Sequence, residues 1–288
     1  MVKRNRRRRK KKRQPKIASI DFRVTDEGHC ILKLPDIPDE ELPDISIITP
    51  TRNRRFIFEL TVHQFQNFMY PKEKIEWVIL DNGDDKIRDL LPADPRIKYL
   101  TLPGDKRYSI ADLRNHCIQH SSHDIIVYMD DDDYYPVESV YARVKALLKY
   151  KKVGVGCVGC TSIGAYNLID CVSNFVSNGD SYLSEATICH TKQFWLERKF
   201  NRNDNGAEYM NFIKNRQDKI RHIPFQFICL ALNHHANSTQ RGTKNVDEKT
   251  LSKKYNFVQF FSEEILEIFD NIIVNISESD IKIETSTK

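Results

Sequence analysis

Four aspartates, Asp130 to Asp133, follow one another at the end of an apolar run in the segment DIIVYMDDDDYYP of residues 124–136. Adjacent carboxylates repel one another and retain protons unless a cation is nearby. A divalent metal supplies such a cation, and Mg²⁺ or Mn²⁺ binds one or two carboxylates together with substrate phosphates. The segment therefore predicts a metal site for a phosphate-containing substrate. An exposed acidic turn is the alternative, and the apolar run directly before the aspartates counts against it.

The spacing of the four carboxylates indicates which of them bind. Side chains alternate in direction along a strand, so Asp130 and Asp132 are expected to share one face while Asp131 and Asp133 point away. This D-x-D spacing gives one metal site. Asp133 stands shortly before the next predicted helix, and we expect it to be the N-cap of that helix.

The elements that must position the acidic segment alternate along the chain. Amphipathic helices are predicted after the first strand, before the acidic strand and over 136–150. The predicted strands are ISIITPT, IEWVILD, IKYLTLPG and DIIVYM. Strand–helix alternation is typical of an α/β fold with a mostly parallel sheet, which binds ligands at the carboxyl ends of its strands. Three segments, PTRN, DNGDD and DDDD, are therefore expected to lie along one rim.

In these segments the chain resembles the nucleotide-binding half of a GT-A glycosyltransferase of family 2. The resemblance covers about residues 44–150 and is carried by SIITPTRN, EWVILDNGDD and SIADLRNHCIQHSSHDIIVYMDDDDYYP. It implies a GT-A fold, a nucleotide-sugar donor, a UDP-sugar above all, and Mn²⁺ or Mg²⁺ as the cofactor. The acceptor implied is a hydroxyl of a glycan, a protein or a small molecule.

The resemblance also implies roles for single residues. It assigns nucleotide contact to Thr49, Pro50, Thr51, Arg52, Asp81, Arg114, Asp130 and Asp131, and metal binding to Asp130, Asp132 and His235. Asp81 would accept a hydrogen bond from the base, and its structural alternative is to shape a turn with Asn82 and Gly83. Arg52 could instead be a surface residue, and Arg114 could pair with Asp112 or with Glu residues.

The second half of the chain must supply the acceptor side. Inverting members of the family need a general base, and Glu208 in the segment GAE is the candidate, with Asp204 as its rival. Many relatives have GED there, so the segment departs from the family pattern. A late histidine ligates the metal in several GT-A enzymes, and between His234 and His235 we favour His235. Arg241 is a further candidate for contact with the diphosphate.

Composition shifts divide the chain of 288 residues into five parts. We predict a disordered basic tail over 1–15, a β-hairpin and connector over 16–43, and the nucleotide-sugar-binding half over 44–150. The acceptor-binding half of the same domain follows over 151–256, and a C-terminal helix with a loose tail over 257–288. The CxxC of Cys157 and Cys160 suits packing better than metal or redox chemistry, because no second CxxC accompanies it.

The tail changes how the net charge of +5 is interpreted. Residues 3–13 hold ten Lys or Arg, so the rest of the chain carries 5 − 10 = −5. The tail is expected to contact nucleic acid or another anionic surface, to act as a nuclear address, or to aid solubility alone. The odd number of cysteines, seven, favours free thiols in a reducing compartment, which indicates the cytoplasm. No transmembrane helix is expected.

The leading hypothesis is a metal-dependent glycosyltransferase that transfers single sugars, with inversion if Glu208 is the base and retention if it lies too far from the acceptor. A second hypothesis is a Mg²⁺-dependent nucleotidyltransferase or phosphohydrolase. TPTRNRR lacks the glycines of a phosphate loop, which argues against the nucleotidyltransferase. A D-x-D phosphatase would carry its aspartates at the end of the first strand and not of the fourth. A third is a non-catalytic nucleic-acid-binding protein that uses the basic tail, whose binding would be sensitive to salt.

Overall fold

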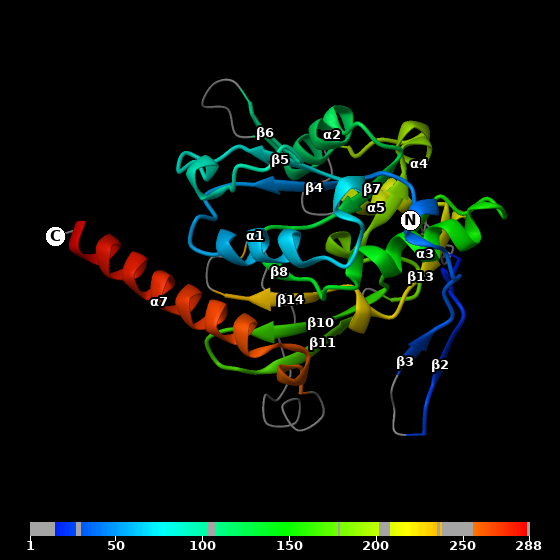
Figure 1. Ribbon diagram of the computed structural model, residues 1–288. Helices are drawn as coiled ribbons and strands as arrows, with labels where there is room; N and C mark the ends of the chain where they lie inside the picture. Colours follow the sequence, from blue (N-terminus) through cyan, green and yellow to red (C-terminus); the bar gives the residue numbers. More distant parts are fainter. Residues whose placement is uncertain are drawn as a thin grey trace, which may run out of the picture.

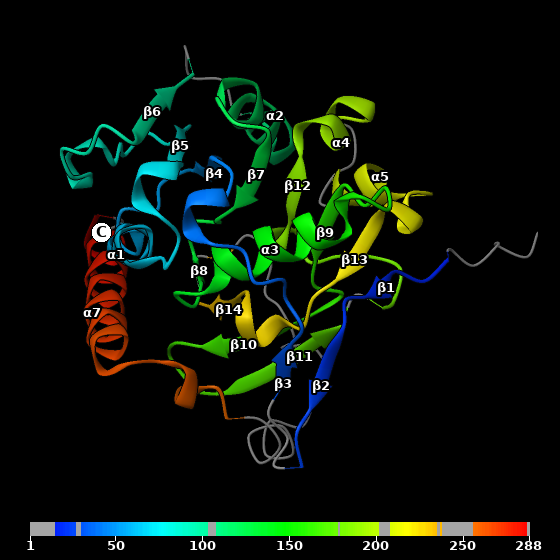
Figure 2. The ribbon, with the colours of Figure 1, turned by 45° about the vertical axis from the view of Figure 1, so that its right-hand side comes forward.

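The computed structural model describes residues 15–26, 30–102, 108–177, 179–201, 208–234, 237 and 256–286. Its centre is an eight-stranded sheet (Figures 1 and 2). The strands, in spatial order, are β1 (Ala18–Ser19), β13 (Ile220–His222), β9 (Cys157–Gly159), β12 (Cys189–Thr191), β7 (Ile125–Tyr128), β4 (Ile45–Thr51), β5 (Ile75–Asp81) and β6 (Ile97–Thr101). Of these described strands, β12 alone runs antiparallel to its neighbours. The predicted α/β class with a mostly parallel sheet is confirmed.

Helices and a second sheet cover both faces of this sheet. The helices are α1 (Phe58–Asn67), α2 (Ile110–His120), α3 (Ser139–Lys151), α4 (Lys192–Glu197) and α5 (Glu208–Ile213). Side chains alternate between two apolar cores, so Ile47 packs with α1 and α3 while Ile48 packs with α2, α4 and α5. Because both faces of the sheet are covered, β4 is buried along its whole length, and its polar side chains are the small Ser46, Thr49 and Thr51.

The second sheet has four strands and lies on the α1 and α3 side. Its order is β11 (Ser173–Ser177), β10 (Ser162–Asn167), β14 (Leu230–Asn233) and β8 (Asp133–Tyr134). The strands of residues 151–256 are therefore divided, because β9, β12 and β13 extend the large sheet while β10, β11 and β14 build the small one. The predicted N-terminal hairpin is present as β2 (Phe22–Val24) and β3 (Cys30–Leu32).

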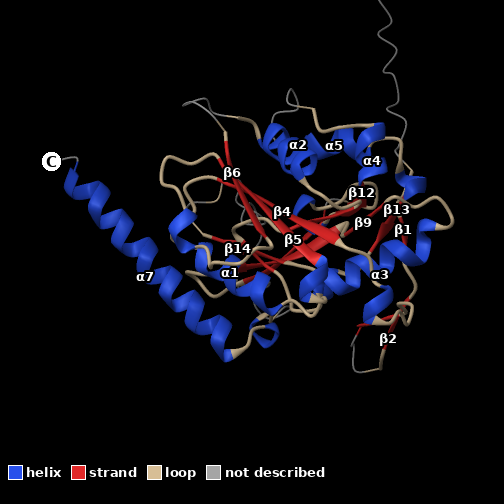
Figure 3. Cartoon of the chain, turned by 45° about the horizontal axis from the view of Figure 1, so that its top comes forward, coloured by secondary structure: helices blue, strands red, loops and turns tan. Residues whose placement is uncertain are grey.

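The C-terminal helix is longer than expected. We predicted a loose tail after about residue 276, but α7 spans Glu263–Ser286 and extends beyond the body of the molecule (Figures 1 and 3). The segment holds no glycine or proline that would end a helix. Its first half is anchored by buried apolar side chains, among them Phe269 and Ile272, which pack in the core beside α1.

A buried histidine connects two neighbouring strands of the large sheet, β12 and β7. His190 of β12 is fully buried, its Nε2 lies 3.1 Å from the Tyr128 hydroxyl, and its Nδ1 lies 2.8 Å from the Thr191 carbonyl oxygen. A neutral imidazole satisfies both contacts by donating from Nδ1 and accepting at Nε2. Burial lowers the pKa of His190 from 6.5 to about 4.

We therefore expect acid sensitivity from this residue. Between pH 6.5 and pH 4 the unfolded chain binds a proton at residue 190 that the folded chain does not, so the free energy of unfolding falls as the pH falls, by on the order of 2–3 kcal/mol. Urea unfolding at several pH values should show a shallower fall for His190→Gln. The exposed His120 gives the control, since His120→Gln should keep the wild-type slope; equal slopes for all three proteins would refute the assignment.

Candidate active site at the acidic segment

The acidic segment is the crossover between the two sheets. Strand β7 ends at Tyr128, the chain turns over residues 129–132, and Asp133 already belongs to β8 of the small sheet. The predicted strand-like alternation of the four aspartates is therefore wrong, because no strand runs through them. The N-cap prediction for Asp133 is also wrong: its Oδ1 accepts from Leu232 N at 3.3 Å, and α3 begins only at Ser139.

Helix α1 holds this crossover from one side. The Thr61 hydroxyl donates to the Asp131 carbonyl at 3.0 Å. The Gln64 side-chain amide donates to the Asp133 carbonyl at 3.3 Å and accepts from the Tyr135 N–H. Both side chains are buried, so the turn is fixed by groups that cannot exchange these bonds for water.

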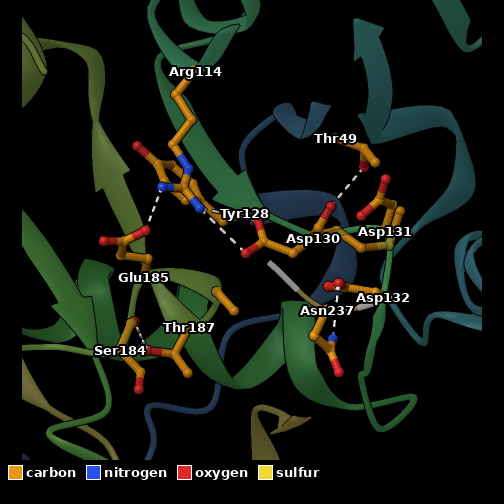
Figure 4. Close-up of polar contacts among 12 residues, drawn as sticks. Thr49, Arg114, Tyr128, Asp130, Asp131, Asp132, Ser184, Glu185, Thr187 and Asn237 are labelled. Carbon is orange, nitrogen blue, oxygen red and sulfur yellow. Dashed lines mark hydrogen bonds and ion pairs between the residues drawn. The ribbon is translucent and has the colours of Figure 1, made fainter. Parts of the chain in front are cut away.

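Strand β4 and the Tyr135 hydroxyl hold the crossover at its beginning. Thr49 donates to the Met129 carbonyl at 2.8 Å and accepts from Trp77 Nε1 at 2.8 Å. The N–H of Asp130 donates to the Tyr135 hydroxyl at 2.8 Å. Thr49 is fully buried, and its hydroxyl is directed at the backbone of the acidic segment (Figure 4).

Asp130 belongs to a network with a buried guanidinium. Arg114 of α2 lies 3.2 Å from Asp130 Oδ2 and 2.5 Å from Glu185 Oε2, and its guanidinium lies over the Tyr128 ring (Figure 4). The Arg114 side chain is 3% exposed, whereas both carboxylates are partly exposed. Arg114 therefore carries its charge at the rim while its side chain stays buried. The carboxylates with which it pairs are Asp130 and Glu185.

A second guanidinium approaches the next two aspartates. Arg54 Nε lies 3.9 Å from Asp131 Oδ1, and Arg54 Nη2 lies 3.5 Å from Asp132 Oδ2. Burial raises the pKa of Asp131 well above its usual range, and the neighbouring Asp132 charge raises it further, while Arg54 opposes both effects. Of the two carboxylates, Asp132 is the one with more exposed surface and with further polar contacts.

Asp132 faces an imidazole and an amide. Asn237 Nδ2 donates to Asp132 Oδ2 at 3.2 Å, and His234 Nε2 lies 3.9 Å from the same oxygen. The His234 ring is buried, with Phe56 edge-on at 5.3 Å. His235, the predicted metal ligand, lies outside the described residues, and the described imidazole beside Asp132 is that of its neighbour. No group of three or more His, Cys, Asp or Glu in the described part of the chain is placed to hold a metal.

The turn after β5 lies on the same rim. Asp81 is fully buried, its Oδ1 accepts from the Gly83 N–H at 2.8 Å, and its Oδ2 accepts from the Ile87 N–H at 3.0 Å and the Tyr99 hydroxyl at 2.7 Å. Asp81 thus shapes this turn. Its carboxylate can still accept one further hydrogen bond, and the contact of Asp81 with a base stays a prediction. Gly83 is required, because a Cβ there would lie 2.6 Å from the Asn53 amide nitrogen.

The segment after β4 completes the rim. Pro50 and Thr51 are buried in β4, and Arg52 is half-buried. Asn53 follows in a left-handed conformation with φ 53°, and its Oδ1 accepts from the Asp84 and Asp85 N–H groups at 2.7 and 3.2 Å. This pairing connects PTRN to DNGDD, so the two segments that the sequence predicted on one rim do lie together.

The remaining predicted residues are Glu208, Asp204 and Arg241, whose side chains the structure does not describe, and the two cysteines of the CxxC. Glu208 begins α5, but the position of its carboxylate is outside the described residues, as are Asp204 and Arg241. All seven cysteines are free thiols. Cys157 and Cys160 are fully buried, and burial raises the pKa of the Cys160 thiol to about 12, which favours the packing interpretation of the CxxC.

Two residues of this site, Arg54 and Glu185, escaped sequence reasoning, and a third, His234, was considered but not preferred. Arg54 was overlooked in favour of Arg52, because RNRR offers several arginines and only the turn at Asn53 selects among them. His234 was named with His235 but not preferred. Glu185 carried no signal, since it lies in a short 3₁₀ turn, Glu185–Thr187, in the region where no motif was found.

This combination of a mostly parallel sheet with an acidic crossover at its carboxyl rim defines a GT-A-type α/β protein. The model of the family described as "Glycosyl transferase family 2" matches residues 46–211. The chain therefore belongs to glycosyl transferase family 2. None of the helices in the described ranges has both the length and the apolar character that crossing a membrane would require.

Individual relatives are distant. The "Probable glycosyltransferase YdaM" of Bacillus subtilis (strain 168) is 24% identical over 157 residues, which are 52% of this chain and 35% of the relative. The chain thus spans about a third of that protein. The mannosyltransferase PcManGT from Pyrobaculum calidifontis, in complex with GDP-Man and Mn²⁺, superposes with a TM-score of 0.51 at 14% identity, covering 84% of this chain and 76% of that one. TarS 1-349 of S. aureus in complex with UDP-GlcNAc has a TM-score of 0.49 at 18% identity, covering 81% and 66%.

The anchoring of the acidic segment by α1 can be tested on one helix. Gln64→Leu leaves the Asp133 carbonyl and the Tyr135 N–H without their partner, so we expect the free energy of unfolding to fall by about 2–4 kcal/mol. Gln66 is exposed on the same helix, and Gln66→Leu should change it by less than about 0.5 kcal/mol. Urea unfolding measures the free energy of unfolding of both variants. An equal loss in Gln64→Leu and Gln66→Leu would rule out the anchoring role of Gln64.

Proposed function

We propose that the protein is a metal-dependent glycosyltransferase that transfers a single sugar from a nucleotide-sugar donor, a UDP-sugar, to an acceptor hydroxyl with inversion. Family membership supports the class of reaction. The observation that carries the proposal is the acidic crossover, which presents Asp130 and Asp132 at the rim beside Arg114, Arg54 and His234. Concentrated opposite charges at one rim suit a diphosphate bound together with a cation.

The donor set beside Asp132 fits a divalent cation. Asp132 contributes a carboxylate oxygen and His234 an imidazole nitrogen, and Mn²⁺ accepts both kinds of ligand. A Mg²⁺ or Mn²⁺ ion typically keeps few protein ligands and takes substrate phosphates for the rest, so two protein donors are enough. Asp132 and Asp130 would hold the metal, and His234 or the predicted ligand His235 would supply an imidazole nitrogen. When bound, the metal neutralises charge on the diphosphate and makes it a better leaving group.

The chain's own residues do the remaining work. Arg114 is held between Asp130 and Glu185, so its orientation is set before any ligand arrives, and we assign it to the nucleotide side of the donor. Arg54 lies close enough to Asp132 to meet phosphate oxygens at the same place. Asp81 and the turn around Gly83 form the wall for the base, together with Thr51 and Arg52. Glu208 takes the proton from the acceptor hydroxyl as this oxygen attacks the anomeric carbon and the nucleoside diphosphate leaves.

The choice of nucleotide needs its own test. The sequence favours UDP, whereas the solved mannosyltransferase with the similar fold carries GDP-Man. Both nucleotides should therefore be titrated.

The decisive experiment is calorimetric titration of UDP and of GDP with Mn²⁺ and with EDTA. We expect UDP to bind only with Mn²⁺, and Asp132→Asn, which keeps the shape but removes the charge, to weaken this binding at least about tenfold. Asp124 stands at the opposite end of strand β7 and is exposed, so Asp124→Asn is the matched control and should bind like the wild type. Binding of neither nucleotide, or binding that ignores both EDTA and Asp132→Asn, would sink the proposal.

A further inference from the structure

A large cavity lies behind the acidic crossover. It has a volume of about 1070 Å³ and is bordered by residues 134–138, which continue from the aspartates, and by the later part of α1, including Gln64 and Asn67. Residues 225–227 and 256–262 form the opposite wall. Arg54 precedes α1, whereas this cavity lies along its last turns, so the cavity is separate from the rim assigned to the donor. Ligand pockets typically enclose roughly 300–1000 Å³, so its size suits a ligand of several rings.

The lining combines aromatic rings with amides. The rings form a connected surface: Phe175 and Phe225 have centroids 5.9 Å apart, Phe225 and Phe257 5.7 Å, and Phe257 and Phe260 6.0 Å. Phe175 is 40% exposed, so part of this surface is open to a ligand. The amide side chains on the lining are Gln64, Asn67, Gln226, Asn256 and Gln259.

The ring surface is built into the small sheet. Gly164 of β10 lies directly behind it, and a Cβ at Gly164 would come within 2.6 Å of the Phe225 ring and 2.7 Å of the Phe257 ring. The missing side chain lets both rings rest on the strand backbone. Phe225 and Phe257 are therefore fixed by packing in the core, and the aromatic wall has a defined position.

The charges and hydrogen-bonding groups of the lining residues limit the classes of ligand that the cavity can bind. No Lys or Arg is among the described lining residues, which include the carboxylates Glu138 and Glu264, so the lining offers a phosphate no Lys or Arg and two carboxylates that repel it. Gln226 lines the cavity and is partly exposed, so its side-chain amide can exchange hydrogen bonds with a hydroxyl of a ligand.

We propose that this cavity binds a neutral saccharide. The polarised C–H groups on the face of a sugar ring suit the negative face of an aromatic ring. Side-chain amides both donate and accept, as sugar hydroxyls do. The saccharide is an outlying unit of the glycan acceptor, and this part of the inference rests on the proposed transferase function. Gln64 lines the cavity and also anchors the acidic crossover, so the two places share a side chain.

The test uses the full chain on a printed array of neutral, sialylated and sulfated oligosaccharides, without nucleotide. We expect binding to neutral oligosaccharides that falls about tenfold in Phe175→Ala and in Gln226→Leu, because each removes one mode of contact. Leu196 of α4 is 58% exposed and remote from the cavity lining, so Leu196→Ala is the control and should bind like the wild type. Phe175 and Gln226 are both partly exposed, and thermal unfolding verifies that the variants fold.

The outcomes separate this inference from the proposed function. Binding of neutral oligosaccharides that persists in Asp132→Asn, while Mn²⁺-dependent nucleotide binding is lost, supports a cavity distinct from the donor site. Nucleotide binding without any oligosaccharide binding overturns the saccharide proposal alone. A preference for sulfated or sialylated oligosaccharides overturns it too, and so does equal binding by Phe175→Ala and Leu196→Ala. Oligosaccharide binding without nucleotide binding overturns the donor site alone.

Discussion

Mutual repulsion among four adjacent carboxylates is the constraint around which this structure is arranged. The chain meets it by giving each carboxylate a different environment. Asp130 pairs with Arg114, Asp132 with Arg54 and Asn237, and Asp133 accepts from the backbone of the small sheet. Asp131, with its raised pKa, is the one that burial drives toward the neutral form. The crossover between the two sheets lets these four consecutive side chains diverge, because the run stands where β7 ends and β8 begins.

The core fixes the geometry of the crossover. Its carbonyl and N–H groups are bound by buried side chains of β4 and α1, namely Thr49, Thr61 and Gln64. A loop of like charges held by water alone would spread apart, whereas these bonds have no solvent to compete with them. The rim is therefore organised before any ligand binds, and its precision derives from the same packing that stabilises the fold. Preorganised charge of this kind is what electrostatic stabilisation of a leaving diphosphate requires.

Local patterns were sufficient for part of this picture. Apolar runs ending in polar turns predicted β4, β5, β6 and β7 and their shared rim, because the hydrophobic pattern and the end of a strand depend on the residues of that strand alone. The direction of the aspartates was not predictable, since it depends on β8 pairing with β14, which lies far along the chain. His234 and Glu185 reach the site through the same kind of long-range pairing. The hydrogen bonds of Asp81 were anticipated as a turn with Gly83, and they leave its contact with a base as a prediction.

Arg54 adds a consequence for the proposed reaction. A guanidinium already lies against Asp131 and Asp132, so a divalent cation must compete with it for the carboxylates and would bind weakly by itself. A diphosphate changes the balance, because its oxygens offer Arg54 another partner and offer the cation further ligands. Each ligand then improves the site for the other, and the favourable coupling free energy is the same in both directions. In the proposed reaction, Arg54 beside the D-x-D segment would therefore delay cation binding until the nucleotide is present, and this is the physical reason to expect the two to bind together.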